Sequence, residues 1–312
     1  MSDLRPLLPE PSGAVAYFGP AGTFTEMALD RLMDRVGWAC RERSAQSSPG
    51  DVVAAVRSGA LEYGCVPMES SVEGAVPATM DALAAGDGVQ ILAETVLDIA
   101  FTVAAAPGRG RDDVQTIAAY PVAEGQTRES LRRLFPSARV VPSSSNAAAA
   151  ADVAAGRADA ALTTALAAGN HGLVALAEDV ADAADATTRF VLIGRPAPVQ
   201  ARTGSDRTAV ILNLPDAPGS LVRAMSEFAT RDIDLMRIES RPRRHSPGYH
   251  FFLDASGHID DPLMGHALAG LHAFAEKVTF LGSWAAERAT GAASPDHSDS
   301  LRWVEALRRG EH

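Results

Sequence analysis

The sequence predicts an α/β protein: a two-lobed unit followed by a smaller domain. Two observations predict it. Near-continuous apolar strands alternate with helices over the first two thirds of the chain, which is typical of a sheet covered on both faces. After a segment rich in Pro, Gly and Ala, the pattern changes to strand, helix, strand, strand, helix, strand. The length of 312 residues suits about two domains of roughly 100–200 residues each.

The first lobe begins with a short apolar strand at Val15–Phe18 and a turn at 19–22. A helix follows through Met33, and a second helix over 51–58 leads into a strand at 63–67. Apolar strands placed between helices in this way predict a mostly parallel sheet. A long apolar run over 95–106 then leads out of the lobe.

The second lobe repeats the alternation, with strands at 116–119, 140–141 and 158–162 and helices near 126–134 and 146–155. A further strand at 188–193 has no partner near it in the sequence. We therefore expect one two-lobed unit over 14–195 whose chain crosses between lobes near 95–102 and 183–190. A cleft between two lobes is a common ligand site.

Residues 196–206 read as a linker, and residues 207–284 carry the β-α-β-β-α-β order of a ferredoxin-like domain. Residues 285–312 are rich in Ala, Ser, Gly and Asp, which predicts a flexible tail. Within that tail, Leu301, Val304 and Leu307 have the spacing of a short amphipathic helix.

Composition excludes several classes of function. The chain has 28 Lys+Arg and 39 Asp+Glu, a net charge of −11, which argues against nucleic acid as a partner. No apolar stretch reaches the ~18 residues of a membrane helix. The N-terminus does not resemble a secretion signal, and only Cys40 and Cys65 are present, so we expect a reducing cytoplasm. The histidines are scattered, so we expect no metal, and no cofactor motif is present.

Two segments at predicted strand ends could bind an anion. In 19–26, Thr23 and Glu26 have the spacing of a capping box, and a helix start suits a carboxylate. In 66–74, Ser70 and Glu73 repeat that spacing beside Glu69. An ordinary helix cap explains either segment taken alone.

Two more loops extend the candidate site. Thr188 and Arg189 open the returning strand, where Arg189 could hold a carboxylate through two parallel hydrogen bonds. Gln126, in the loop at 120–126, could bind a polar group of a substrate. Each residue alone also fits a solvated surface, but hydroxyl-rich segments converging with one arginine near a cleft favour an anion site.

The combination resembles prephenate dehydratase. The segments GPAGTFTE (19–26), VPMESSVEG (66–74) and TRF (188–190) are similar to that family's signature segments, in the same order. PGSL (218–221) and ESRP (239–242) resemble the phenylalanine-binding motifs of its regulatory ACT domain. The likeness covers roughly residues 14–284. It departs at Ser70, where the family has asparagine, and in the 120–127 loop, where the second glutamine, Gln126, is kept but the histidine, the first glutamine and the cysteine are not.

The resemblance implies a two-lobed periplasmic-binding-protein-like catalytic part and an ACT domain over 207–284. It implies a carbon–oxygen lyase of phenylalanine biosynthesis that converts prephenate to phenylpyruvate, water and carbon dioxide without a cofactor. It also implies L-phenylalanine as effector and a homodimer or homotetramer formed through ACT domains. Thr188 is the implied catalytic residue. The implied substrate contacts are Gly22, Thr23, Glu69, Ser70, Ser71, Gly74, Gln126, Arg189 and Phe190. The implied effector contacts are Gly219, Ser220, Leu221, Glu239, Ser240, Arg241 and Pro242.

Two alternatives stay open on sequence alone. A prephenate decarboxylase would share the scaffold but keep the ring hydroxyl, and the product would distinguish it. A non-catalytic amino-acid sensor would need an output module, and residues 285–312 contain none that the sequence reveals. Formation of phenylpyruvate from prephenate separates enzyme from sensor.

Overall fold

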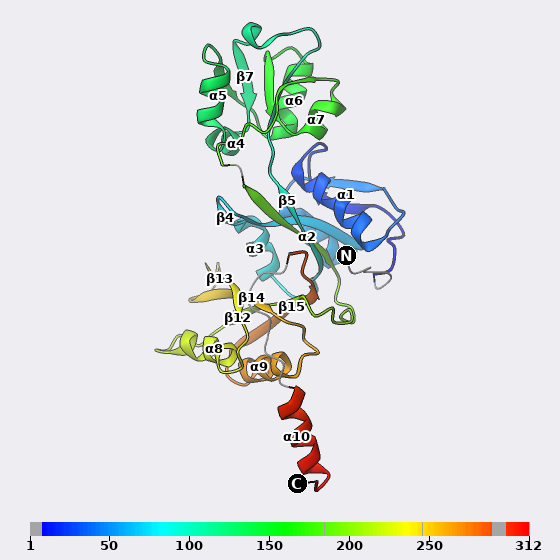
Figure 1. The fold of residues 1–312 in the computed structure, drawn as a ribbon, viewed down its shortest axis with the longest axis vertical. Coiled ribbons are helices and arrows are strands. Elements are labelled where there is room, and N and C mark those ends of the chain that lie inside the picture. The colour runs from blue at the N-terminus through cyan, green and yellow to red at the C-terminus, as the bar shows by residue number, and fades with distance from the viewer. Residues whose placement is uncertain (1–7, 184, 245, 289–297, 312) are drawn as a thin grey trace. The chain divides into compact units, whose positions relative to one another are not determined.

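The computed structural model describes residues 8–183, 185–244, 246–288 and 298–311 (Figure 1). The chain divides into two compact units, 1–198 and 199–312, and each is described by itself. Among the described residues, every helix is too short or too polar to cross a membrane.

Lobe 1 of the first unit is built on a mixed sheet of order β2-β1-β3-β11-β5, with β4 paired to the end of β3. Its strands are β1 (Val15–Phe18), β2 (Arg43–Gln46), β3 (Tyr63–Ser70), β4 (Gly74–Ala75), β5 (Gln90–Asp98) and β11 (Thr187–Gly194). β1 runs parallel to β2 and β3, whereas β11 is antiparallel to β3 and β5. β1, β2, β3 and β5 run in the same direction, as the expected mostly parallel sheet requires. The exceptions are β4 and β11, and β11 is antiparallel because it returns from the second lobe.

Helices cover both faces of this sheet. α1 (Phe24–Val36) packs Leu29 and Leu32 into one core with Phe190 and Leu192 of β11. α2 (Pro49–Ser58) lies on the other face, where a Cβ atom at Gly64 would meet Val52 and Val56. α3 (Pro77–Ala84) packs beside α2. β11 thus lies between the two layers, and alternate side chains face opposite helices.

Lobe 2 contains a five-stranded sheet of order β10-β6-β9-β7-β8. Its strands are β6 (Thr102–Ala105), β7 (Thr116–Ala119), β8 (Arg139–Pro142), β9 (Ala160–Thr163) and β10 (Val174–Ala177). Its helices are α4 (Pro121–Gly125), α5 (Arg128–Leu134), α6 (Asn146–Ala154) and α7 (Ala165–Asn170), with a 3₁₀ turn at Arg111–Asp113. The strands β7, β8 and β9 are parallel, so α4, α6 and α7, which follow them, all begin at one edge.

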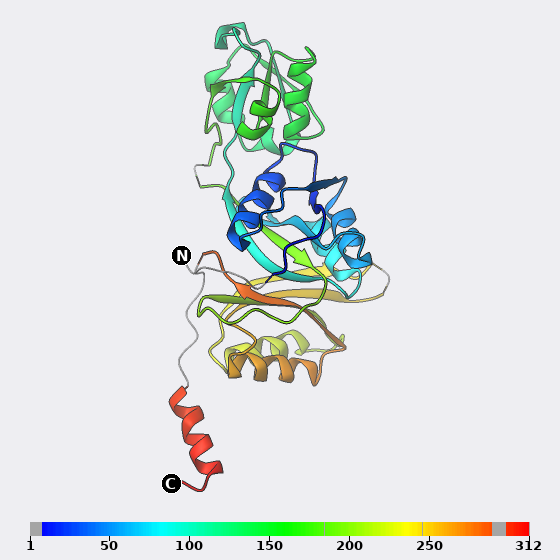
Figure 2. The same ribbon diagram turned by 90° about the vertical axis from the view of Figure 1, so that its right-hand side faces the viewer.

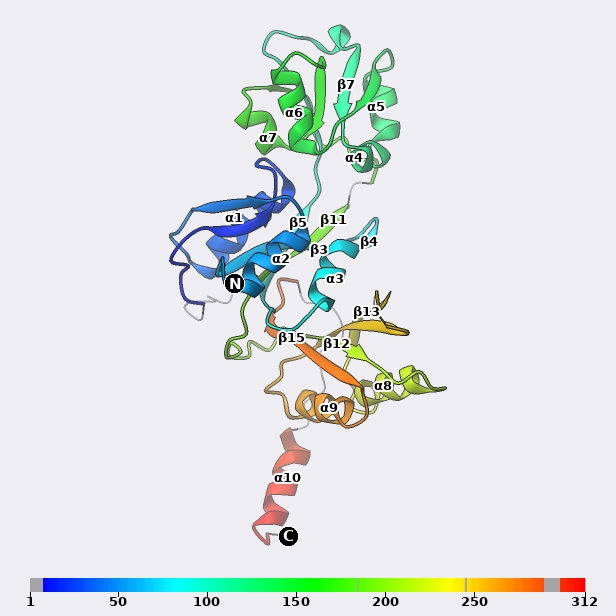
Figure 3. The same ribbon diagram turned by 180° about the vertical axis from the view of Figure 1, so that it is seen from behind.

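The chain passes between the lobes twice. It leaves lobe 1 between β5 and β6 and returns between β10 and β11. The two passes are hydrogen-bonded, since the Ile99 N–H donates to the Ala186 carbonyl at 2.8 Å. Figure 3 shows both passes. The first pass covers 99–101, inside the expected stretch 95–102, whereas the second covers 178–186 and only overlaps the expected stretch 183–190. Residue 184 lies outside the described residues.

The second unit carries β12 (Asp206–Asn213), α8 (Ser220–Ala229), β13 (Leu235–Pro242), β14 (Tyr249–Ser256), α9 (Pro262–His272) and β15 (Lys277–Ala285). Its antiparallel sheet has the order β13-β14-β12-β15. Both helices pack on one face, as Figure 2 shows. The predicted ferredoxin-like order is confirmed.

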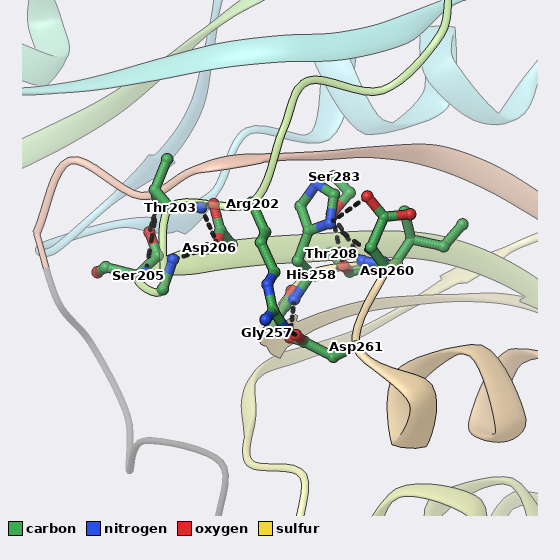
Figure 4. A network of polar contacts seen from close by, with 12 residues as sticks. Arg202, Thr203, Ser205, Asp206, Thr208, Gly257, His258, Asp260, Asp261 and Ser283 are labelled. Carbon is green, nitrogen blue, oxygen red and sulfur yellow. Dashed lines mark hydrogen bonds and ion pairs between the residues drawn. The ribbon is translucent and has the colours of Figure 1, made fainter. Parts of the chain in front are cut away.

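The ends of this unit differ in detail from the expectation. Residues 203–206, expected to belong to the linker, form a turn. In this turn the Asp206 carboxylate accepts hydrogen bonds from the Thr203 and Gly204 N–H groups at 2.8 and 2.9 Å (Figure 4). β15 continues to Ala285. The short helix expected in the tail is α10 (Ser298–Arg308), and much of the tail predicted to be flexible, 289–297, lies outside the described residues.

Candidate active site at the start of β11

Thr188 lies near the beginning of β11, paired with Ser70 of β3 and Leu97 of β5. Side chains alternate along a strand, so Thr188 shares its face with Phe190 and Leu192, which pack under α1. Its side chain is partly exposed. Among the residues that the structure describes, none forms a hydrogen bond with the Thr188 hydroxyl. This hydroxyl therefore faces the α1 side of the sheet and can take a new partner.

Arg189 points to the opposite face, where two glutamates surround it. Its guanidinium lies 3.3 Å from Glu94 Oε2 and 3.2 Å from Glu69 Oε2. Arg189 and Glu94 are both buried, with side chains 7% and 1% exposed. The sequence suggested that Arg189 and Glu69 would contact the substrate. In this structure they bind each other on the side of the sheet away from Thr188, and their contact with substrate stays a prediction.

The start of α1 differs from the predicted capping box. Thr23 is the N-cap, but its hydroxyl donates to the Phe18 carbonyl at 3.3 Å and makes no capping bond. Glu26 accepts from the Gly22 N–H at 2.6 Å and from Arg43 at 3.0 Å. The box fails because both carboxylate oxygens of Glu26 have other partners. No side chain at the cap therefore satisfies the first N–H groups of α1, and such groups attract anions.

The segment after β3 is a hairpin and not a helix start. Residues 71–73 form a turn, and β4 pairs back onto β3. The Ser70 hydroxyl accepts hydrogen bonds from the Val72 and Glu73 N–H groups at 3.2 and 3.4 Å. An asparagine side chain makes the same kind of turn, which explains how serine can replace the family's asparagine.

The hairpin also fastens the start of β11. The Ser71 N–H donates to the Thr187 carbonyl at 2.8 Å, and the Ser71 hydroxyl accepts from the Thr187 N–H at 2.9 Å. Gln126 of lobe 2 donates to Glu73 Oε1 at 3.2 Å, so it meets the hairpin across the lobes. Gly74 is exposed with a φ of +77° and open space around it.

Two further predicted contacts have structural roles. Phe190 is 2% exposed and lies in the core under α1, so its ring does not reach a ligand. Gly22 has both backbone groups occupied: its N–H binds Glu26, and its carbonyl accepts from the Thr164 hydroxyl at 2.7 Å. The contact of either residue with substrate stays a prediction.

Sequence reasoning missed Thr164. A signal was available, because Thr163 and Thr164 end an apolar strand directly before an alanine-rich helix. A hydroxyl at that position is typical of an N-cap. Nothing in the sequence could indicate that its second bond crosses to residue 22, which lies 142 positions away.

The chain was compared with known proteins. The family model described as prephenate dehydratase matches residues 15–198, more than half of the chain. The chain belongs to the prephenate dehydratase family. A prephenate dehydratase from Mycolicibacterium vanbaalenii is 51% identical over 307 residues, covering 95% of this chain and 98% of the relative. The expected family and enzyme class are confirmed: this is a carbon–oxygen lyase that forms phenylpyruvate, water and carbon dioxide from prephenate.

Solved structures extend the likeness over both units. A prephenate dehydratase from Arthrobacter aurescens, in complex with L-Phe, has a TM-score of 0.86 and 36% identity, covering 95% of this chain and 99% of that one. A protein titled GqqA, a novel type of quorum quenching acylase, has a TM-score of 0.78 and 29% identity, covering 88% and 98%. Since one fold carries two named activities, the family assignment depends on sequence and not on shape alone.

Proposed function

We propose that the dehydration takes place on the α1-facing side of β11, with Thr188 assisting the departing hydroxyl. One observation carries this proposal. The hydroxyls of Thr23, Ser70 and Ser71 each bind a backbone group, whereas no described residue hydrogen-bonds to the Thr188 hydroxyl. Of these four hydroxyls, that of Thr188 is the one with no hydrogen-bond partner among the described residues. Thr25, the fifth hydroxyl-bearing residue of the signature segments, is 4% exposed and therefore closed to a ligand.

The reaction needs little beyond positioning and help for the leaving group. The prephenate dianion takes up one proton and gives the phenylpyruvate monoanion, carbon dioxide and water. The bond from the ring to its carboxylate breaks, the electron pair completes the aromatic ring, and the C4–O bond breaks. A hydrogen bond from Thr188 to the departing oxygen stabilises its developing negative charge, and solvent supplies the proton. Such acid assistance contributes ~10²–10⁴ in rate, or about 3–5 kcal/mol.

The N-terminus of α1 supplies the complementary charge. Its uncapped N–H groups and its partial positive charge suit one substrate carboxylate. α1 packs on the same face of the sheet that Thr188 occupies. Thr23, Gly74 and Gln126 remain proposed contacts around this position. Ser70 and Ser71 support it by shaping the hairpin that holds β11.

The test is Thr188→Ala with prephenate as substrate and phenylpyruvate as product. We expect kcat to fall by ~10²–10⁴ with little change in thermal unfolding, and Thr188→Ser to keep much of the activity. Mass spectrometry of the product separates dehydration from decarboxylation alone, which leaves a hydroxylated dihydro acid. Wild-type kcat in the alanine variant would remove Thr188 from the mechanism.

We also propose that L-phenylalanine binds the second unit and regulates the enzyme. β12 and β13 are both antiparallel to β14, so they run in the same direction and end at one edge of the sheet. The ligand would lie between two copies of this unit, near Gly219–Leu221 of one chain and Glu239–Pro242 of another. Gly219 begins α8 with a φ of +83° and open space around it, and Leu221 and Ile238 are 40% and 51% exposed.

Exposed apolar side chains at this edge would be covered by a second copy, which supports a homodimer or homotetramer formed through these domains. The proposed effector contacts are Gly219, Ser220, Leu221, Glu239, Ser240, Arg241 and Pro242. The Arthrobacter aurescens relative was solved with L-Phe, and that likeness supports the same ligand class here.

Calorimetry with L-phenylalanine tests the effector site. We expect Leu221→Glu to weaken binding at least tenfold, or about 1.4 kcal/mol, because the change removes an apolar contact and adds a charge like that of the ligand's carboxylate. Activity without phenylalanine should stay unchanged. The matched control is Val174→Glu, at an exposed valine of lobe 2, which should bind phenylalanine normally. Normal binding by Leu221→Glu would contradict this placement.

A further inference from the structure

Thr164 lies at the junction of the two lobes, directly after β9 and at the N-cap of α7. Its side chain is buried, with 1% exposure. The hydroxyl accepts from the Ala167 N–H at 3.0 Å and donates its proton to the Gly22 carbonyl at 2.7 Å. One side chain of lobe 2 thus caps a helix of its own lobe and binds the backbone of lobe 1.

The N–H group of Gly22 is also hydrogen-bonded. Its N–H donates to Glu26 Oε2 at 2.6 Å, and Glu26 is 7% exposed. Glu26 in turn accepts from Arg43 of β2 at 3.0 Å. A continuous chain of polar contacts therefore connects β2, the first turn of α1, the Gly22 turn and α7. We call Gly22, Glu26, Thr164 and Ala167 the lobe joint.

Close packing supports the lobe joint. A Cβ atom at Gly22 would lie 2.8 Å from the Ala167 Cβ and 3.0 Å from its Cα, and the φ of +88° also favours glycine. Beside it, the rings of Phe24 and Phe101 meet edge to face with centroids 5.6 Å apart. The start of α1 is thus fixed against lobe 2 by both hydrogen bonds and apolar contact.

The bond between Gln126 and Glu73 also joins the lobes, but it differs in character. It is 3.2 Å long and solvent-exposed, so water can replace it at little cost. The buried bond at Thr164 has no such substitute, because breaking it would leave the Gly22 carbonyl buried and unsatisfied. The lobes can therefore part at the Gln126 side while the lobe joint stays closed.

We propose that Thr164 is a positioning residue for the dehydration. Its hydroxyl fixes the Gly22 turn, and with it the N-terminus of α1, at the position where a substrate carboxylate binds. This inference rests on the proposed function, which places the substrate between α1 and Thr188. Thr164 acts through Gly22 and does not touch the reacting atoms.

The experiment compares Thr164→Val and Thr164→Ser in the full chain, with prephenate as substrate. A displacement of ~1 Å at a binding group can cost about 100-fold, so we expect the valine variant to lose roughly 10–100-fold in kcat/KM, mainly through KM. The serine variant keeps the hydroxyl and should stay close to wild type. Hydrogen exchange of residues 19–27 should also quicken in the valine variant, although the substitution lies 142 positions away from residue 22.

Ser48→Ala is the matched control. Ser48 is the N-cap of α2 and accepts from the Asp51 N–H at 3.1 Å, with cap bonds confined to lobe 1. Its loss removes a comparable helix cap, but it should leave KM and the exchange of residues 19–27 unchanged. If the valine variant does not fold, Thr164→Ala replaces it, and the same changes in KM and exchange are expected because the hydroxyl that binds Gly22 is again absent.

A folded Thr164→Val enzyme with wild-type KM and wild-type exchange at 19–27 would overturn the proposal. So would a Ser48→Ala enzyme that shows the same losses. Thr188→Ala separates this inference from the proposed function. If that variant kept full activity while Thr164→Val still loosened residues 19–27, the role of Thr188 would be wrong and the lobe joint would stand.

Discussion

The two faces of β11 carry neighbouring residues with opposite character. On the α1 face, Thr188 presents a partly exposed hydroxyl that binds no described residue. On the other face, Arg189 is buried between Glu69 and Glu94. These residues are adjacent in one signature segment, yet the period of two along a strand separates them. Residues that are adjacent in a motif can therefore point to opposite faces of a sheet, and on our proposal only the face of Thr188 carries the chemistry.

Ser70 and Thr188 make a second contrast, this time across the sheet. They are direct partners in the β3–β11 ladder. The Ser70 hydroxyl accepts two hydrogen bonds in the turn that follows it, whereas that of Thr188 has no partner among the described residues. Of two paired hydroxyls in one sheet, one can thus support a turn while, on our proposal, the other assists the reaction.

Removing the charge of Arg189 should give the largest effect on stability. Arg189→Met removes the positive charge that Arg189 places beside the buried Glu94 carboxylate, and breaking a buried ion pair costs about 3–5 kcal/mol. We expect a large fall in the melting temperature, measured by calorimetry, and a kcat per folded molecule that falls far less than in Thr188→Ala. A stable but inactive Arg189→Met enzyme would show that the two faces share the chemistry after all.

Changing Ser70 should have a smaller effect that depends on the replacement. Ser70→Ala removes the acceptor for two turn N–H groups and should destabilise the fold by about 1 kcal/mol. Ser70→Asn keeps an acceptor and should match wild type in both melting temperature and kcat. A Ser70→Asn enzyme with greatly altered kcat would mean that position 70 touches the substrate.

The smallest effect concerns Asp182, on the pass that returns to β11. Burial alone would raise the pKa of Asp182, but hydrogen bonds from the Glu129 and Ser130 N–H groups outweigh it and hold the pKa below its usual range. Because the pKa of Asp182 is lower in the folded state than in the unfolded state, its carboxylate stabilises the fold at pH values above the unfolded-state pKa, near 3.8. This stabilisation is lost as the pH falls through the folded-state pKa.

Asp182→Asn should therefore lower the free energy of unfolding by about 0.5–1 kcal/mol at pH 7. This is a small effect for the loss of a helix cap, because the residue is exposed. The difference in unfolding free energy between the variant and wild type should become smaller below pH ~4. Denaturant unfolding of both proteins at pH 7 and below pH ~4 measures this change. A gap that stayed constant with pH would mean that the carboxylate charge plays no part in holding α5.

The sequence by itself determined the order of elements, the two passes between lobes, the ferredoxin-like domain and the family. Those features follow from local periodicity and from motifs that are short and contiguous. It also identified Thr188 as the residue to test, although it grouped Arg189, Glu69 and Phe190 with it.

Only the tertiary structure decided which neighbours share a face and which polar groups are already bound. The spacings Thr23–Glu26 and Ser70–Glu73 are identical in the sequence, yet neither forms a capping box. Glu26 instead binds Gly22 and Arg43, and Ser70 shapes a hairpin. A polar group forms a hydrogen bond with a suitable partner within about 3 Å, however far away that partner lies in the sequence. For Gly22 and Thr164 that partner belongs to the other lobe.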